Sequence, residues 1–243
     1  MLRSLYIEVI KLKRSTMLLV SMLGVAVAPF LNYLIFLSLK SNIPSAMSVE
    51  RYFEQGYIFL TALIATMIFA LIGTYVFDRE YQEKTLENML TIPIGRVEVI
   101  ITKMIILLGW IIFLVLFTFA LTVLLNYMGV FVKLDAEILI KYFRIYLMTG
   151  ILHFALMPVI ILITLVFKSY IYSIGFSIFV TITSLVITNT KYGELFPWSL
   201  PYLLAAYKGD LYYPVSYPII SITMTFILSL TLCIVYFNKE DID

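Results

Sequence analysis

Residues 78–103 read DREYQEKTLENMLTIPIGRVEVIITK, and this charged passage lies between two long apolar runs. Acidic and basic residues occur along most of its length, whereas the runs at 56–77 and 104–125 contain no Asp, Glu, Lys or Arg. Uncharged runs of about 20 residues are typical of membrane-spanning helices. We therefore expect a water-facing element held between two spans.

The composition indicates an integral membrane protein with an all-α fold. The 243 residues are 62% hydrophobic and 13% charged, whereas soluble domains are closer to half apolar and a quarter charged. The length allows one membrane domain, residues 1–243, and leaves no room for a separate soluble catalytic domain. A net charge of +2 gives no reason to expect nucleic-acid binding. The single cysteine, Cys233, excludes an internal disulfide and a Cys-rich metal site.

Six uncharged runs are long enough to cross a hydrocarbon core of about 30 Å as helices. They cover residues 17–37, 56–77, 104–125, 145–167, 170–188 and 217–237. We expect polar connections at 40–55 and 126–144, and a longer extracellular connection at 189–216. Before the first run, residues 1–14 place their apolar side chains on one helical face, which predicts an amphipathic helix in the membrane interface.

The distribution of basic residues predicts the orientation. An even number of spans places both ends of the chain on one side of the membrane. If that side is cytoplasmic, the inner segments hold the larger share of Lys and Arg, as the positive-inside rule requires. The basic residues before the first span carry most weight: Arg3, Lys11, Lys13 and Arg14. We therefore expect residues 78–103 to face the cytoplasm of a cell-membrane protein.

The uncharged runs lack the groups that would let this chain supply its own energy. Carriers coupled to protons or ions need ionisable side chains at membrane depth, and the candidate here is His153 in the fourth run. The sequence contains no GxxxxGK[ST] motif for ATP and no HExxH motif for a metal. Work done on a transported compound must therefore come from a partner. Two alternatives are a membrane-embedded enzyme using His153 with a serine, and a sensor or scaffold without transport.

Within 78–103, the pattern predicts a short amphipathic helix followed by a turn. Glu80 and Lys84 are spaced to pair along a helix. Pro93 then interrupts the pattern, and Gly95 permits a turn before the next span. Leu86, Met89 and Leu90 supply a small apolar face. A solvated loop is the alternative interpretation.

The passage from Glu80 to Lys103 resembles the signature loop of ABC-2 type transporter permeases. The resemblance includes an acidic residue, a Thr-Leu pair, an L-T-x-P-x-x-R turn and a Lys at the start of the next span. It extends over nearly the whole chain, through the amphipathic start, the six spans and the outer connection. The chain is most similar to the bacitracin-export and lantibiotic self-protection permeases of Gram-positive bacteria.

The resemblance implies a coupling helix within residues 78–103 that is seated in a groove of a separate ABC ATPase subunit. The residues expected to make or orient this contact are Glu80, Glu83, Lys84, Glu87 and Arg96, with Pro93 and Gly95 forming the turn. It also implies that this chain has no catalytic, cofactor or metal site, because ATP and Mg would be bound by the ATPase.

Three further expectations come from the same resemblance. A second permease subunit, identical or different, would complete the pore within the lipid bilayer. Residues 189–216 would form an outer re-entrant or gate region. The cargo would be an amphipathic antimicrobial peptide or a similar hydrophobic compound that is exported.

Overall fold

The computed structural model describes residues 5–6, 8, 10, 15–42, 48–82, 95–129, 133–206 and 211–239. Within these ranges the regular secondary structure is entirely helical. Six helical stretches are long and apolar enough to cross a membrane, which confirms the all-α class and the six predicted spans. The helix predicted at 1–14 lies largely outside the described residues.

Five of the six described spans are longer than the uncharged runs suggest, and α8 matches its run to within one residue. The six spans are α2 (Met17–Asn42), the continuous series α3 (Val49–Ile58), η2 (Phe59–Ile64) and α4 (Ala65–Gln82), α6 (Arg96–Gly129), α7 (Ala136–Phe167), α8 (Tyr170–Ile187) and α10 (Ser216–Lys239). The connection expected at 126–144 is therefore mostly helical. Helices can continue past the hydrocarbon core because long charged side chains at their ends extend to water.

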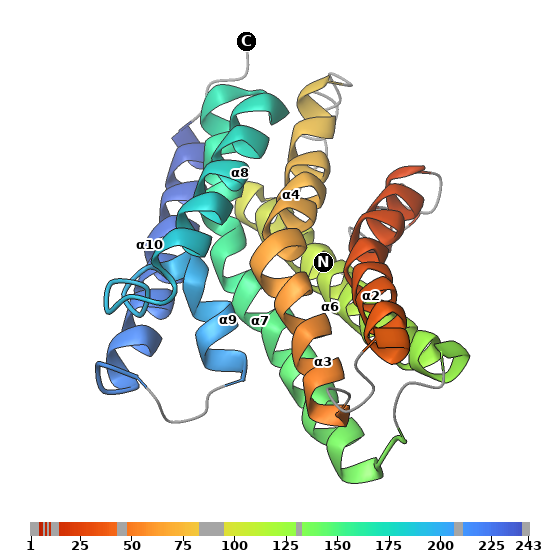
Figure 1. Cartoon of the computed structure of the whole chain (residues 1–243). Coiled ribbons are helices and arrows are strands. Elements are labelled where there is room, and N and C mark those ends of the chain that lie inside the picture. Colours follow the sequence, from red (N-terminus) through yellow and green to blue (C-terminus); the bar gives the residue numbers. More distant parts are fainter. Residues whose placement is uncertain are drawn as a thin grey trace.

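Successive spans alternate in direction, so the helix ends gather at two ends of the bundle (Figure 1). One end contains the end of α4 and the start of α6, which residues 83–94 join in sequence, and we call it the loop end. The ends of α7 and α10 lie there too. The opposite end contains the starts of α3 and α7. The central helix is α7, which contacts α4, α6, α8 and α10.

The surface of the bundle suits lipid rather than water. Large apolar side chains such as Leu23 and Val186 are each 72% exposed, which would be unfavourable in water. Inside, threonine hydroxyls donate to carbonyls one turn earlier on their own helix, as Thr118 does to Leu114 at 2.8 Å. These bonds satisfy polar groups that have no water available to them. The chain is a multi-pass membrane protein.

The second span contains one irregular turn, the π-helix η2. The N–H group of Ala65 bonds to the carbonyl of Leu60, five residues earlier. The hydroxyl of Thr61 donates to the Tyr57 carbonyl at 2.8 Å. Single π turns inside α-helices occur frequently at functional sites. The segment η2 is therefore a candidate functional region within an otherwise regular span.

The connection at 189–216 is more structured than a loop, and its described part is tied to α10. It contains η3 (Pro197–Ser199) and α9 (Leu200–Ala205). The Glu194 carboxylate, only 3% exposed, accepts hydrogen bonds from the N–H groups of Tyr212 at 2.6 Å and Tyr213 at 2.8 Å. The hydroxyl of Ser221 on α10 donates to the Leu195 carbonyl at 2.9 Å.

Candidate functional site

The described residues frame the predicted coupling element on both sides. Gly95 and Arg96 are described, and Glu80 lies in the last turn of α4, although its side chain is outside the description. The remaining predicted coupling residues, Glu83, Lys84, Glu87 and Pro93, lie outside the described residues. The described geometry is that of the two points where the charged stretch enters and leaves the bundle.

Arg96, the first residue of α6, binds the end of another span. Its Nη1 atom donates to the carbonyl of Phe237 at 3.0 Å and to that of Asn238 at 3.2 Å. Both carbonyls belong to the last turn of α10, where carbonyl groups have no partner within the helix and the helix dipole favours a positive charge. The start of α6 and the end of α10 are thus held together at the loop end.

Lys103 lies about two helical turns further into α6 and is only 3% exposed. Its ammonium group donates to the Val76 carbonyl on α4 and lies 5.2 Å from the ring centroid of Phe77. Asp78, one residue further along α4, is 5% exposed. The sequence placed Asp78 and Lys103 at the two limits of a water-facing stretch, whereas the structure buries both between helices.

Gly95 is not required by the backbone geometry around it. A Cβ added at this position would meet no atom of the described residues within 4 Å, and the φ of Gly95 lies outside the left-handed region. The Gly95 carbonyl accepts from the N–H group of Val99 at 3.2 Å, which makes Gly95 the N-cap residue directly before α6. Its proposed role in a turn depends on residues before it, so that role stays a prediction.

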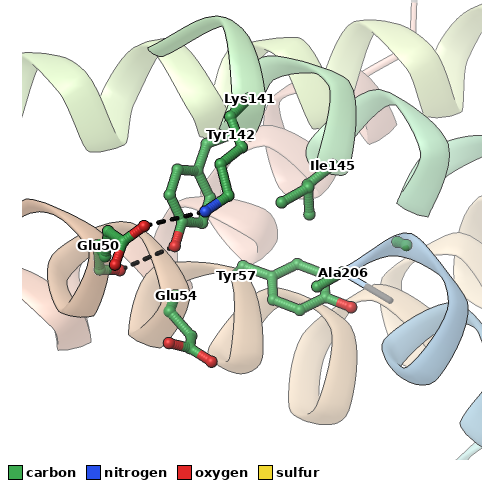
Figure 2. Close-up of a pocket in the computed structure, with 8 residues that line it drawn as sticks. Glu50, Glu54, Tyr57, Lys141, Tyr142, Ile145 and Ala206 are labelled. Atoms are coloured by element: carbon green, nitrogen blue, oxygen red, sulfur yellow. Dashed lines mark hydrogen bonds and ion pairs between the residues drawn. The ribbon is translucent and has the colours of Figure 1, made fainter. Parts of the chain in front are cut away.

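A cavity of about 300 Å³ lies at the opposite end of the bundle. Its walls come from α3, α7 and the end of α9 (Figure 2). The polar side chains in it are Glu50, Glu54, Tyr57, Lys141 and Tyr142. The sequence analysis placed Lys141 within the polar connection expected at 126–144 and gave the two glutamates no role. The glutamates and Lys141 come from segments about 90 residues apart. No local sequence pattern indicates that these segments meet.

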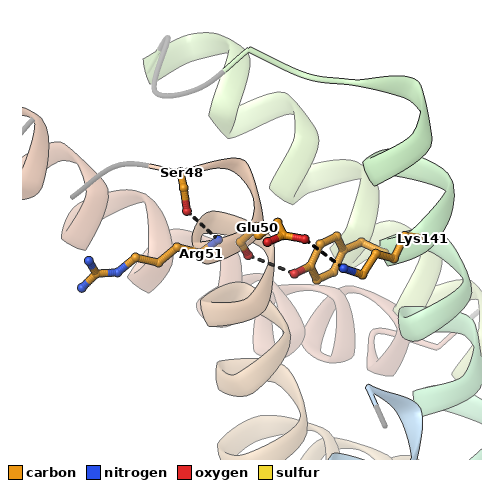
Figure 3. A network of polar contacts seen from close by, with 5 residues as sticks. Ser48, Glu50, Arg51 and Lys141 are labelled. Atoms are coloured by element: carbon orange, nitrogen blue, oxygen red, sulfur yellow. Dashed lines mark hydrogen bonds and ion pairs between the residues drawn. The ribbon is translucent and has the colours of Figure 1, made fainter. Parts of the chain in front are cut away.

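The start of α3 is held in place by capping and by α7 (Figure 3). The Ser48 hydroxyl accepts from the Arg51 N–H group at 3.2 Å, as expected for a helix N-cap. Lys141 and Tyr142 approach from α7: the ammonium group meets the Glu50 carboxylate at 3.0 Å, and the phenol donates to the Glu50 carbonyl at 3.0 Å. The Arg51 side chain points away from this contact.

His153 has the environment of a packing residue. Its Nδ1 atom is 2.9 Å from the Thr149 carbonyl one turn earlier, and its ring meets Phe69 edge-on. Among the described residues, no hydrogen bond joins it to a serine hydroxyl. Within the same part of the chain, no group of three or more His, Cys, Asp or Glu side chains could hold a metal ion.

Known proteins resemble this chain over most of its length. The model of a family described as ABC-2 family transporter protein matches residues 4–184, well over half of the chain. The bacitracin transport permease protein BCRB of Bacillus licheniformis is 38% identical over 190 residues, which are 78% of this chain and 91% of that protein. The region that the family model matches includes residues 78–103 and the cavity residues on α3 and α7. Both α9 and α10 lie beyond it.

Proposed function

The chain belongs to the ABC-2 family of transporter proteins, and we propose that it is the permease of an exporter for an amphipathic antimicrobial peptide or a similar hydrophobic compound. Membership of this family makes the chain a transporter membrane subunit that works with an ATPase subunit and is not itself catalytic. It therefore replaces the alternative of an enzyme built on His153. The observation that carries the cargo proposal is the 38% identity to a bacitracin transport permease.

The proposed site of energy coupling is the stretch 78–103. Its outer part would contact the ATPase through Glu80, Glu83, Lys84 and Glu87, and its turn would be formed by Pro93 and Gly95. The contacts made by Arg96 and Lys103 support this assignment, because each binds a helix other than its own. A displacement of the stretch would therefore act on α10 and α4 as well as on α6.

The proposal places both ends of the chain and residues 78–103 on the cytoplasmic face of a Gram-positive cell membrane. Two permease subunits, identical or different, would form the pore. A Glu87→Cys variant in a Cys233→Ala background should react with a membrane-impermeant maleimide only after the cells are opened. Glu137→Cys, at the opposite end of the bundle, should react in intact cells. The reverse pattern would overturn the orientation and the coupling site together.

Transport itself can be tested by profiling drug susceptibility. A sensitive strain that expresses this chain with its ATPase should tolerate higher concentrations of bacitracin or related cell-wall peptides than a strain with either subunit alone. Unchanged tolerance to all peptides tested would overturn the cargo proposal. Tolerance that persists with a hydrolysis-deficient ATPase would support the sensor or scaffold alternative.

The coupling residues need a separate comparison. Reversing Glu83 and Glu87 to Lys should abolish the added tolerance, because the helix would present the wrong charge to the ATPase groove. The matched control is Glu137→Lys, which changes an exposed glutamate at the opposite end. Equal tolerance in the reversed variant and the control would refute the coupling role.

A further inference from the structure

The second span has a break in its hydrogen bonding between α3 and α4. In a regular α-helix the N–H group of Ala65 would bond to the Thr61 carbonyl, whereas in η2 it bonds to the Leu60 carbonyl. Thr61 is only 5% exposed, so water is not at hand to replace the lost donor. Sharp bends in helices occur at a few kinds of position, and π turns are one of them. The segment η2 is therefore the place where the second span bends most easily.

The polar groups around this break are incompletely bonded. The ring of His153 on α7 is 1% exposed and lies near two backbone carbonyls, those of Thr149 and Thr61. Its Nδ1 atom is 2.9 Å from the Thr149 carbonyl, whereas its Nε2 atom has no hydrogen-bond partner among the described residues. A carbonyl without its helical donor and an unpartnered ring nitrogen thus lie close together. A buried polar cluster in this condition does not fix one geometry as a fully bonded cluster does.

The part of the span before the break is bonded to its neighbours through the backbone. Asn32 on α2 donates to the Tyr52 carbonyl at 3.1 Å, and the Tyr52 hydroxyl donates to the Thr122 carbonyl on α6 at 2.9 Å. The Tyr142 hydroxyl on α7 donates to the Glu50 carbonyl at 3.0 Å (Figure 2). Three other spans therefore hold α3.

Tyr57 adds a fourth attachment, directly before the break. Its hydroxyl donates to the carbonyls of Pro201 and Tyr202 on α9, and its ring stacks on that of Tyr202 with centroids 5.9 Å apart. The π-helix begins two residues later, at Phe59. Bonds to four separate elements leave α3 little freedom to tilt as a unit.

The part of the span after the break is bonded toward the loop end. The Val76 carbonyl on α4 accepts from the ammonium group of Lys103 on α6, and these two residues flank the charged stretch. The Thr74 hydroxyl accepts from that of Thr164 on α7 at 3.4 Å, which is long for such a bond. The end of α4 is thus tied most closely to the start of α6, and a displacement of the charged stretch would move both.

We propose that η2 is the joint of the second span, about which α4 tilts while α3 stays fixed to its four neighbours. A displacement of residues 78–103 would then tilt α4 and leave the opposite end of the bundle in place. That an ATPase supplies this displacement rests on the proposed function. The joint itself does not depend on that function, because it is a property of the helix and its attachments.

The test removes the joint and keeps the span. A π turn holds one residue more than the α-helical turn that it replaces. Deleting Leu63, which is 37% exposed, should therefore leave a continuous α-helix with the other side chains of the span in place. The matched control is deletion of Leu71 in the regular part of α4. It rotates one side of the helix by about 100° relative to the other and displaces side chains as deeply buried as those of Phe69 and Ile72.

Melting of the full chain in lipid nanodiscs compares the two deletions. The chain without Leu63 should melt within a few degrees of the parent, whereas the chain without Leu71 should melt far lower or fail to fold. If the two deletions are equally destabilising, η2 holds no extra residue and the proposal is overturned.

Amide hydrogen exchange, measured in the same nanodiscs without an ATPase, reports local opening. In the parent, the amides of residues 61–66 should exchange about ten-fold faster than those of residues 50–57 or more. Deletion of Leu63 should remove this difference. Equal exchange along the parent's second span would refute the joint, because a joint must open more often than the helix on either side of it.

The same variant separates the joint from the proposed function. In a strain where the parent and its ATPase raise drug tolerance, the chain without Leu63 should lose most of that gain although it is folded. Full tolerance with a straight span would overturn the mechanical role of η2 and leave the exporter proposal standing. If the parent never changes tolerance, the exporter proposal fails, and melting and amide exchange still decide the joint.

Discussion

Replacing Arg96 by Met tests whether the start of α6 is anchored to α10. The substitution keeps an unbranched apolar stem and removes the Nη1 donor of the two hydrogen bonds, at 3.0 and 3.2 Å, to the last carbonyls of α10. A hydrogen bond from a charged donor contributes about 1.5–3 kcal/mol when shielded from water. Here Asn238 is exposed and water can replace the guanidinium, so we take about 1 kcal/mol for the pair.

The helix dipole adds to this value. A positive charge at a helix C-terminus contributes about 0.3–1 kcal/mol, so the loss for Arg96→Met should total about 1–2 kcal/mol. Arg96→Lys should lose less, since it keeps the charge and can reach one carbonyl. Thermal unfolding of the chain in nanodiscs, followed by tryptophan fluorescence, should place Arg96→Met below Arg96→Lys and both below the parent.

The control for this series is Arg144→Met, which removes an exposed arginine at the opposite end of the bundle. Its melting temperature should equal that of the parent chain. If Arg96→Met melts with the control, the contact with α10 contributes nothing and the anchoring argument is wrong. A loss of transport at unchanged melting temperature would instead indicate that Arg96 acts on the ATPase directly.

Four other predictions test separate parts of the fold. Glu194→Gln replaces a buried carboxylate that accepts two N–H bonds by an amide whose single oxygen can accept only one of them well. The free energy of unfolding should fall by about 2–3 kcal/mol, and proteolysis within residues 189–216 should become faster. An unchanged rate of proteolysis would contradict this prediction. Gly193→Ala would place a Cβ 2.5 Å from a backbone oxygen and should lower the yield of folded protein. Gly175→Ala, whose added Cβ would meet no described atom within 4 Å, should not. Tyr57→Phe should cost about 1 kcal/mol and increase amide hydrogen exchange in α9; equal exchange would argue against the link. Lys103→Met leaves a buried carbonyl without its donor and should lower stability by about 1–3 kcal/mol, measured as a lower melting temperature; a higher one would refute the reasoning.

The spans could be predicted from sequence because their physical signal is local. A hydrocarbon core of fixed thickness requires about 20 uncharged residues in a row, and all six such runs became helices. The helix ends were predicted less accurately, because each expected span was taken to end near polar or charged residues. Arg96 and Lys141 both lie inside helices, because a helix can continue into the interface while its charged side chains find water or a partner.

The environments of particular side chains could not be predicted, because they depend on other helices. Lys103 reads as the first charge outside a span, yet its ammonium group is buried on a carbonyl of α4. The cavity needs Glu54 and Lys141 to meet from distant segments, and the turn at η2 has no sequence signature. The resemblance to a family is what predicts a coupling role for residues 78–103, whereas physical pattern alone favoured a short helix with a turn and left a solvated loop as the alternative.

The second span is the element that connects the two polar regions of the molecule. It begins at α3 with the cavity carboxylates and ends at α4 with Val76 and Asp78, next to the charged stretch. Continuity along a helix does not by itself couple two sites; coupling requires an element with two discrete arrangements. Within this span the π turn at η2 is the break in the regular α-helical bonding, and such turns occur frequently at functional sites. Tyr57, which touches both the cavity and α9, lies directly before that turn. Residues 57–82 are therefore the direct covalent connection between the cavity at one end of the bundle and the charged stretch at the other.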